Sequence, residues 1–251
     1  MDLIKKFLDI HKILDKIQDM PGNYTAFKLG LAAAVACGAF TFLLGGGIVE
    51  VICAFFGAGV GNFIRKKLLE KHITLFANVA VGVASACCVY VLLIKLSEII
   101  WDISNVHQAG YICSMLFVIP GSPLITGGID LAKLDLRSGL ERTTYALLII
   151  IVATLTGWIT ATIFQFQPSD FEEICLNPIL MFILRLAASF CGVYGFSLMF
   201  NSTKKMALTA GIIGMIVNTL RLELIDFTPI PVAAAAFIGS LCSGLLASAI
   251  K

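Results

Sequence analysis

The feature that most constrains this chain is a succession of long apolar runs with few charged residues. A hydrocarbon core about 30 Å thick is crossed by about 20 helical residues. The chain is 59% hydrophobic and 14% charged, whereas a soluble domain is about one quarter charged. The sequence therefore predicts an all-α, polytopic membrane helix bundle of about eight transmembrane helices, at residues 27–44, 46–64, 73–96, 108–132, 143–164, 175–200, 206–220 and 230–250.

The basic residues predict how these spans are oriented. If the N-terminus is cytoplasmic, fifteen of the eighteen Lys and Arg residues lie on the cytoplasmic side, as the positive-inside rule requires. The opposite loop 165–174 (QFQPSDFEEI) carries three acidic residues and no basic one. We therefore expect a multi-pass protein of the plasma membrane, in contact with the lipid bilayer, with both termini in the cytoplasm. Residues 1–26 are expected to form a cytoplasmic amphipathic segment.

Several classes of function have little support in the sequence. The net charge is +2, without a basic stripe that would bind nucleic acid. The eight cysteines lie mostly within apolar runs, where cysteine acts as a small packing residue, and their spacing is not that of a metal site. We find no hydrolase or metalloprotease motif. The expectation is a protein that is not an enzyme and that uses no cofactor.

An internal repeat divides the chain into two unequal parts. In the first span of each part, Cys37-Gly38 and Phe42 recur as Cys191-Gly192 and Phe196. In the next span, the residues Ala54, Asn62, Arg65 and Leu68 recur in the same order as Ala210, Asn218, Arg221 and Leu224. Five spans precede the second copy, so it enters the membrane from the opposite side, as in the inverted repeats of secondary transporters. The alternative is coincidence among small and apolar residues. We predict a five-span repeat at 27–164 and an incomplete three-span repeat at 175–251, completed by further chain or by another polypeptide.

The fourth span contains residues that interrupt a helix. Residues 118–130 read VIPGSPLITGGID, and Pro120 with Gly121 should end one half-helix (109–119) near the bilayer midplane. Ser122 would cap the second half-helix (123–133) and Pro123 would be its first residue.

A helix N-terminus inside the membrane presents free amide N–H groups and a positive dipole end, which favour an anion. Residues 120–123 are therefore predicted to bind the carboxylate of a substrate, with hydroxyl contacts from Ser122 and Thr126. The alternative is a simple proline kink between packed helices.

Three charged residues within the spans are candidate functional groups, because charge is costly in lipid. Asp130 could carry a coupling proton or gate the site, or it could pair with one of the basic residues Lys133, Arg137 and Arg142. Glu50 and Arg185 are predicted at similar depth, where they could pair. Alternatively, Arg185 would bind a substrate carboxylate while Glu50 takes up a proton.

The segment 119–142, IPGSPLITGGIDLAKLDLRSGLER, resembles the signature of the threonine/serine exporter family. The matching positions are Pro120-Gly121, Pro123-Leu124, Asp130 and Gly139-Leu140-Glu141-Arg142; weaker likeness covers the glycine turn 45–47, Ala54-Phe55-Phe56, Ile64-Arg65 and residues 195–205. The resemblance implies a multi-pass exporter of small amino or carboxylic acids driven by an ion gradient, encoded as one fused chain or as two subunits. This chain departs from the family pattern in lacking most of the soluble region before the first span, in lacking two late spans, and in carrying Thr126 where asparagine is common.

The leading hypothesis is a secondary-active exporter of threonine, serine or small carboxylates, with protons as the coupling ion. A second hypothesis is a noncatalytic assembly subunit, or a half-transporter that requires a complementary membrane subunit or a homo-oligomer. A third is a channel.

Overall fold

The computed structural model describes residue 14 and residues 22–101, 108–166 and 176–250. Every regular element in these residues is helical, and the elements are α2 (Ala26–Leu43), α3 (Ile48–Glu70), α4 (Leu75–Trp101), α5 (Gln108–Ser114), the 3₁₀ turn η1 (Leu116–Val118), α6 (Gly121–Ala132), α7 (Leu136–Ile163), α8 (Pro178–Met199), α9 (Lys204–Phe227) and α10 (Val232–Ala249). The predicted N-terminal amphipathic segment lies almost wholly outside the described residues.

Seven of the described helices are long and apolar enough to cross a membrane. The predicted fourth span, 108–132, is the exception, because it consists of α5, η1 and α6 in succession. The polytopic helical bundle and its broken fourth span are thus confirmed. The predicted limits of the seventh span, 206–220, were wrong, since α9 extends over Lys204–Phe227.

Side-chain caps fix where several of the helices begin. Thr25, Asp135, Asn177 and Thr203 each accept a hydrogen bond from a backbone amide in the first turn of the following helix. Such caps satisfy amides that would otherwise lack an acceptor at a helix start. The apolar runs set the lengths of these helices, and the caps set their starting residues.

Small residues allow α3 and α4 to approach each other closely. A Cβ atom added to Gly61 would lie 2.6 Å from the Ala86 Cβ and 2.7 Å from the Gly82 carbonyl oxygen. Close backbone contact at glycine is a common way to associate helices where lipid removes the hydrophobic driving force. The core beside this contact is built from α2, α3, α4 and α5, together with η1 and the middle of α7, and the Tyr90 ring lies edge-on to Tyr111 within it.

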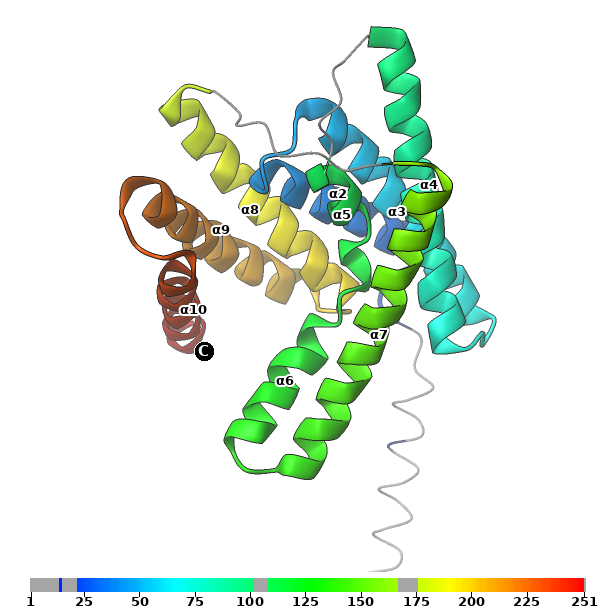
Figure 1. The fold of residues 1–251 in the computed structure, drawn as a ribbon. Helices are drawn as coiled ribbons and strands as arrows, with labels where there is room; N and C mark the ends of the chain where they lie inside the picture. The colour runs from blue at the N-terminus through cyan, green and yellow to red at the C-terminus, as the bar shows by residue number, and fades with distance from the viewer. Residues whose placement is uncertain (1–13, 15–21, 102–107, 167–175, 251) are drawn as a thin grey trace, which may run out of the picture.

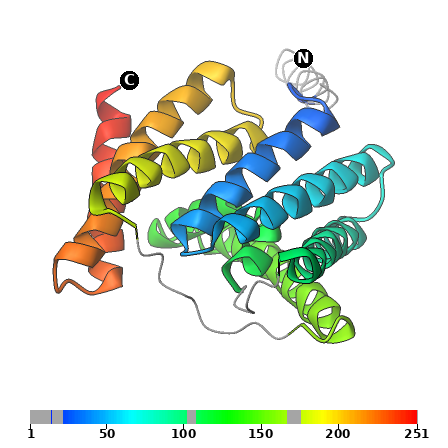
Figure 2. The same cartoon turned by 90° about the horizontal axis from the view of Figure 1, so that it is seen from above.

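The remaining helices extend this core in two directions (Figures 1 and 2). α8 packs on α2 and α9, and α10 packs on α9. On the other side α6 and α7 form a hairpin whose far end extends away from the remaining helices in Figure 1. α6 makes its extensive contacts with α7, and Gly127 is its one buried residue.

Candidate functional site

The break in the fourth span is a tight turn at Pro120. Ile119 is extended (φ −60°, ψ 121°), and Pro120 has φ −82° and ψ 64°. The Gly121 amide donates to the Ile119 carbonyl at 2.9 Å, which makes this an inverse γ-turn. The helix α6 therefore starts at Gly121, before the predicted position. The prediction that Ser122 caps the helix was wrong, because Pro120 occupies the cap position and no side chain caps it.

This turn leaves fewer free amides than the sequence suggested. The Gly121 amide is used by the turn, Pro123 has no N–H, and the Leu124 amide donates to the Pro120 carbonyl at 3.2 Å. Within the described residues, the Ser122 amide is the one in this first turn without a backbone acceptor. The start of α6 can thus offer a single main-chain donor to an anion.

The Thr126 hydroxyl is directed toward its own helix. It donates to the Ser122 carbonyl at 2.9 Å, with the Pro123 carbonyl at 3.4 Å. A hydroxyl bonded in this way keeps its oxygen lone pairs but not its proton for a ligand. A small cavity of about 170 Å³ lies between the break and α7, lined by Ile112, Met115, Leu116, Val118, Ile119, Pro120, Ile149, Ile150, Ala153 and Thr154.

Arg65 reaches the broken span from α3, although it was not among the predicted site residues. Its Nη1 donates to the Phe117 carbonyl oxygen in η1 at 3.3 Å. One turn earlier, the Asn62 amide Nδ2 donates to the Leu29 carbonyl at 2.8 Å and joins α3 to α2. The recurrence of Asn62 and Arg65 as Asn218 and Arg221 was the signal that could have identified this arginine.

Glu50 is a carboxylate in the interior of the bundle. It lies in the first turn of α3 and is only 4% exposed. It is close enough to Tyr90 and Cys113 to interact electrostatically with both. A Cβ on Gly46 would lie 2.5 Å from its Oε2, so the glycine turn before α3 leaves room for this carboxylate. The start of a helix favours negative charge.

Arg185 joins α8 to the end of α9. Its Nη1 lies 2.9 Å from Glu223 Oε1, and its Nη2 lies 2.6 Å from Asp226 Oδ2. The predicted pair between Glu50 and Arg185 was wrong, because the last turns of α9, which lie beyond the predicted span, bring two carboxylates to Arg185. Both terminal nitrogens of this guanidinium are therefore already bound within the protein.

Asp130 belongs to the hairpin of α6 and α7. Its Oδ2 accepts from the Ser138 hydroxyl at 2.9 Å and lies 3.4 Å from Arg142 Nη1. Of the three basic residues suggested as partners, the structure selects Arg142; Arg137 pairs with Glu141 at 3.2 Å instead. Asp130 therefore connects α6 to α7 through its contacts with Ser138 and Arg142.

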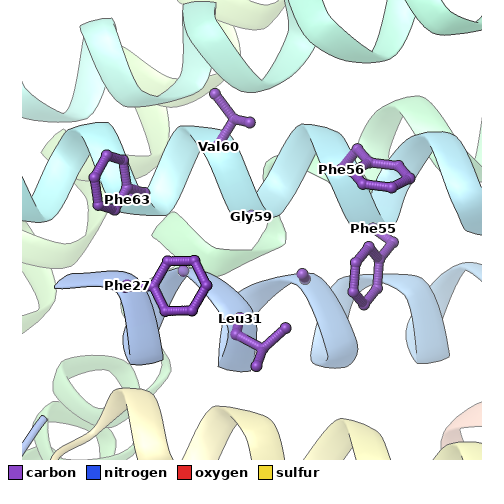
Figure 3. Close-up of a pocket in the computed structure, with 9 residues that line it drawn as sticks. Phe27, Leu31, Phe55, Phe56, Gly59, Val60 and Phe63 are labelled. Atoms are coloured by element: carbon purple, nitrogen blue, oxygen red, sulfur yellow. The ribbon is translucent and has the colours of Figure 1, made fainter. Parts of the chain in front are cut away.

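A larger hollow lies between α2 and α3 (Figure 3). It measures about 420 Å³ and is lined by Phe27, Gly30, Leu31, Ala34, Phe55, Phe56, Gly59, Val60 and Phe63. Among the described residues no charged or hydrogen-bonding side chain lines it, and most of its large side chains are exposed. Such a surface suits hydrocarbon and not a charged substrate.

Comparison with known proteins assigns the first part of the chain. A family model described as "Putative threonine/serine exporter" matches residues 6–164, and this region ends with α7. The chain is 28% identical over 152 residues to "Probable succinate transporter subunit YjjP" of Escherichia coli K12, which covers 61% of this chain and 57% of that relative. The protein with the same description in Klebsiella aerogenes is 26% identical over 155 residues, covering 62% and 57% respectively.

The chain thus spans less than two thirds of the length of these relatives. No solved structure gives a significant match. The apolar helices and the family match together make this a multi-pass membrane protein of a transporter family. The sequence signature at 119–142 and the match over 6–164 lead to the same conclusion: the chain belongs to the threonine/serine exporter family.

Proposed function

We propose that this chain is a secondary-active exporter of small amino acids or carboxylates, or the larger part of one. The observation that carries the proposal is the interrupted fourth span, in which α5 and η1 end at Pro120 and α6 begins at Gly121. Backbone that leaves the helical ladder inside a membrane persists where it is buried or lines a cavity. Here the break lies beside a cavity and within the residues that match the family.

Glu50 and Asp130 are the groups proposed to carry or gate a coupling proton. The burial of Glu50 in the apolar core supports this role. A carboxylate inside a membrane is costly unless its charge is compensated by a partner or removed by protonation. Asp130 is more exposed and is already paired with Arg142, which favours a gating role between α6 and α7. Threonine or serine and succinate are the substrates that the family and its relatives suggest by name. Both termini face the cytoplasm in this proposal.

A complementary membrane subunit, or a second copy of the chain, is part of the proposal. α6 leaves Ile125 and Ile129 exposed on the side away from α7, in the segment that would hold the substrate. The relatives are named as transporter subunits. The inverted repeat supports the same view, because Asn218 of α9 donates to Ser189 of α8 much as Asn62 of α3 donates to α2.

Export from cells tests the proposal. Cells expressing this chain, with and without a complementary membrane subunit of the same family, should excrete threonine, serine or succinate faster than cells with the empty vector. Replacing Pro120 by alanine should slow export by straightening the break. Pro178→Ala is a matched control, because Pro178 stands at the start of α8, where a proline is tolerated.

The alternatives predict different results. An assembly subunit would tolerate Pro120→Ala without loss of function. A channel would give ion conductance in planar bilayers without exchange of labelled substrate. If the protein reaches the membrane and excretion equals that of the vector control in every combination, the export proposal fails.

A further inference from the structure

Arg65 is a cation of α3 that has no carboxylate partner among the described residues. No aspartate or glutamate in the described part of the chain lies within ion-pair distance of its guanidinium. Its one hydrogen bond there goes to the Phe117 carbonyl, at 3.3 Å. Arg185 of α8, in contrast, binds two carboxylates. Because an arginine has five donors and is costly to hold in an apolar setting, Arg65 has the capacity to bind an anion.

Asn78 is a buried polar residue of α4. Its side chain is 1% exposed, and its Oδ1 has no hydrogen-bond partner among the described residues. Buried amide oxygens are nearly always hydrogen-bonded, because leaving one unpaired carries a desolvation penalty. An acceptor in this condition can take a donor that is not among the described residues, such as a bound ligand.

These two residues belong to the same contact between α3 and α4. A Cβ on Gly82 would lie 3.1 Å from the Arg65 Cβ, and Asn78 precedes Gly82 by one helical turn on the same face of α4. Tyr145 of α7 is near enough to Arg65 to interact with it electrostatically. The contact therefore lies where α3, α4, η1 and α7 meet, directly before the break at Pro120.

We propose that Arg65 binds the carboxylate of the transported substrate and that Asn78 Oδ1 accepts a hydrogen bond from a second group of the same molecule. That group is an ammonium in an amino acid, or a protonated carboxyl in a dicarboxylic acid. The inference rests on the export function proposed above and names the residues that recognise the substrate. Pulling Arg65 from the Phe117 carbonyl toward a ligand would also release η1, and so couple binding to movement at the break.

Direct binding to the purified full chain tests this site without requiring transport. Calorimetric titration in lipid nanodiscs would use L-threonine and succinate as separate probes. Arg65→Gln should weaken binding of the active probe by about tenfold or more, since a charge-assisted bond to a carboxylate is lost. Arg65→Lys should be intermediate, because it keeps the charge and loses the planar fork. Lys67→Gln, an exposed neighbour of the same charge, should bind like wild type.

Variants of Asn78 separate recognition from structure. Asn78→Leu should weaken binding while leaving the unliganded protein at least as thermostable, because it removes an unpaired buried acceptor. Asn78→Asp should strengthen threonine binding and weaken succinate binding, and so it identifies which class of ligand the site takes.

The site is overturned if folded wild-type protein binds neither probe. It is also overturned if Arg65→Gln lowers the melting temperature but leaves affinity unchanged, as expected of an arginine that only fastens η1. Export that persists in cells carrying Arg65→Gln would refute the site and leave the export function standing. Binding that depends on Arg65, in a protein that does not export, would support the site and refute the export function.

Discussion

Replacing Arg185 with methionine should destabilise the contact between α8 and α9, and the size of the effect can be worked from the structure. Methionine has a similar length but no charge, so Glu223 and Asp226 lose their shared cation. Arg185 and Glu223 are 15% and 21% exposed, whereas Asp226 is 45% exposed. The pair with Glu223 is therefore the better shielded of the two.

Breaking a fully buried ion pair costs about 3–5 kcal/mol, and breaking an exposed one costs about 1 kcal/mol or less. Because these groups retain some contact with solvent, we expect Arg185→Met to cost about 2–3 kcal/mol. At about 2–4 °C per kcal/mol for a chain of this size, the melting temperature should fall by about 4–12 °C.

The assay is thermal unfolding of purified protein in detergent, followed by static light scattering and tryptophan fluorescence. Arg137→Met is the matched control, because its pair with Glu141 has side chains 90% and 67% exposed, and it should change the melting temperature little. The triple variant Arg185→Met, Glu223→Gln, Asp226→Asn should recover most of the loss, since no uncompensated carboxylate remains. If the triple variant is no more stable than the single one, the reasoning from charge is refuted; if stability is unchanged while substrate binding is lost, Arg185 serves the substrate after all.

Three further substitutions have expected outcomes that thermal unfolding or, for the last, an efflux assay can check. Gly61→Val should lower the melting temperature, at a cost of about 1–3 kcal/mol, because its side chain would overlap α4; Gly128→Ala, which has open space, should not. Tyr111→Phe should cost about 1 kcal/mol by removing the hydroxyl that donates to the Gly157 carbonyl at 2.6 Å, and an unchanged melting temperature would contradict this. Asp130→Asn should change stability by less than about 1 kcal/mol, yet slow substrate efflux from loaded cells; normal efflux would remove Asp130 from the transport mechanism.

The fold was largely predictable because its main signal is local. A run of about 20 apolar residues specifies a membrane helix without reference to its neighbours. The length of the seventh span was underestimated because the prediction used only this local signal. Arg221, Glu223 and Asp226 end the apolar run of α9 in the sequence, but the helix continues because Arg185 of α8 neutralises two of them. That compensation depends on tertiary contact and cannot be read from α9 alone.

The candidate site was predictable to a lesser extent. The break followed from Pro120 and Gly121, whose effects on the backbone are intrinsic. The γ-turn that starts α6 at Gly121 depends on the conformation of Pro120 and was missed. Arg65 was missed because its place beside two lysines suggested a cytoplasmic loop, and only the three-dimensional structure turns its side chain to the Phe117 carbonyl.

The second half of the chain repeats the arrangement around Arg65 with one element missing from the described residues. A Cβ on Gly239 of α10 would lie 3.5 Å from the Arg221 Cβ, as one on Gly82 of α4 lies 3.1 Å from that of Arg65. Arg65 then donates to a carbonyl of the broken span, whereas the buried Arg221 Nε has no acceptor among the described residues. Buried donors are rarely left in this state. The predicted inverted repeat leads us to expect that a carbonyl from a second broken helix, in a complementary polypeptide, is the acceptor for Arg221.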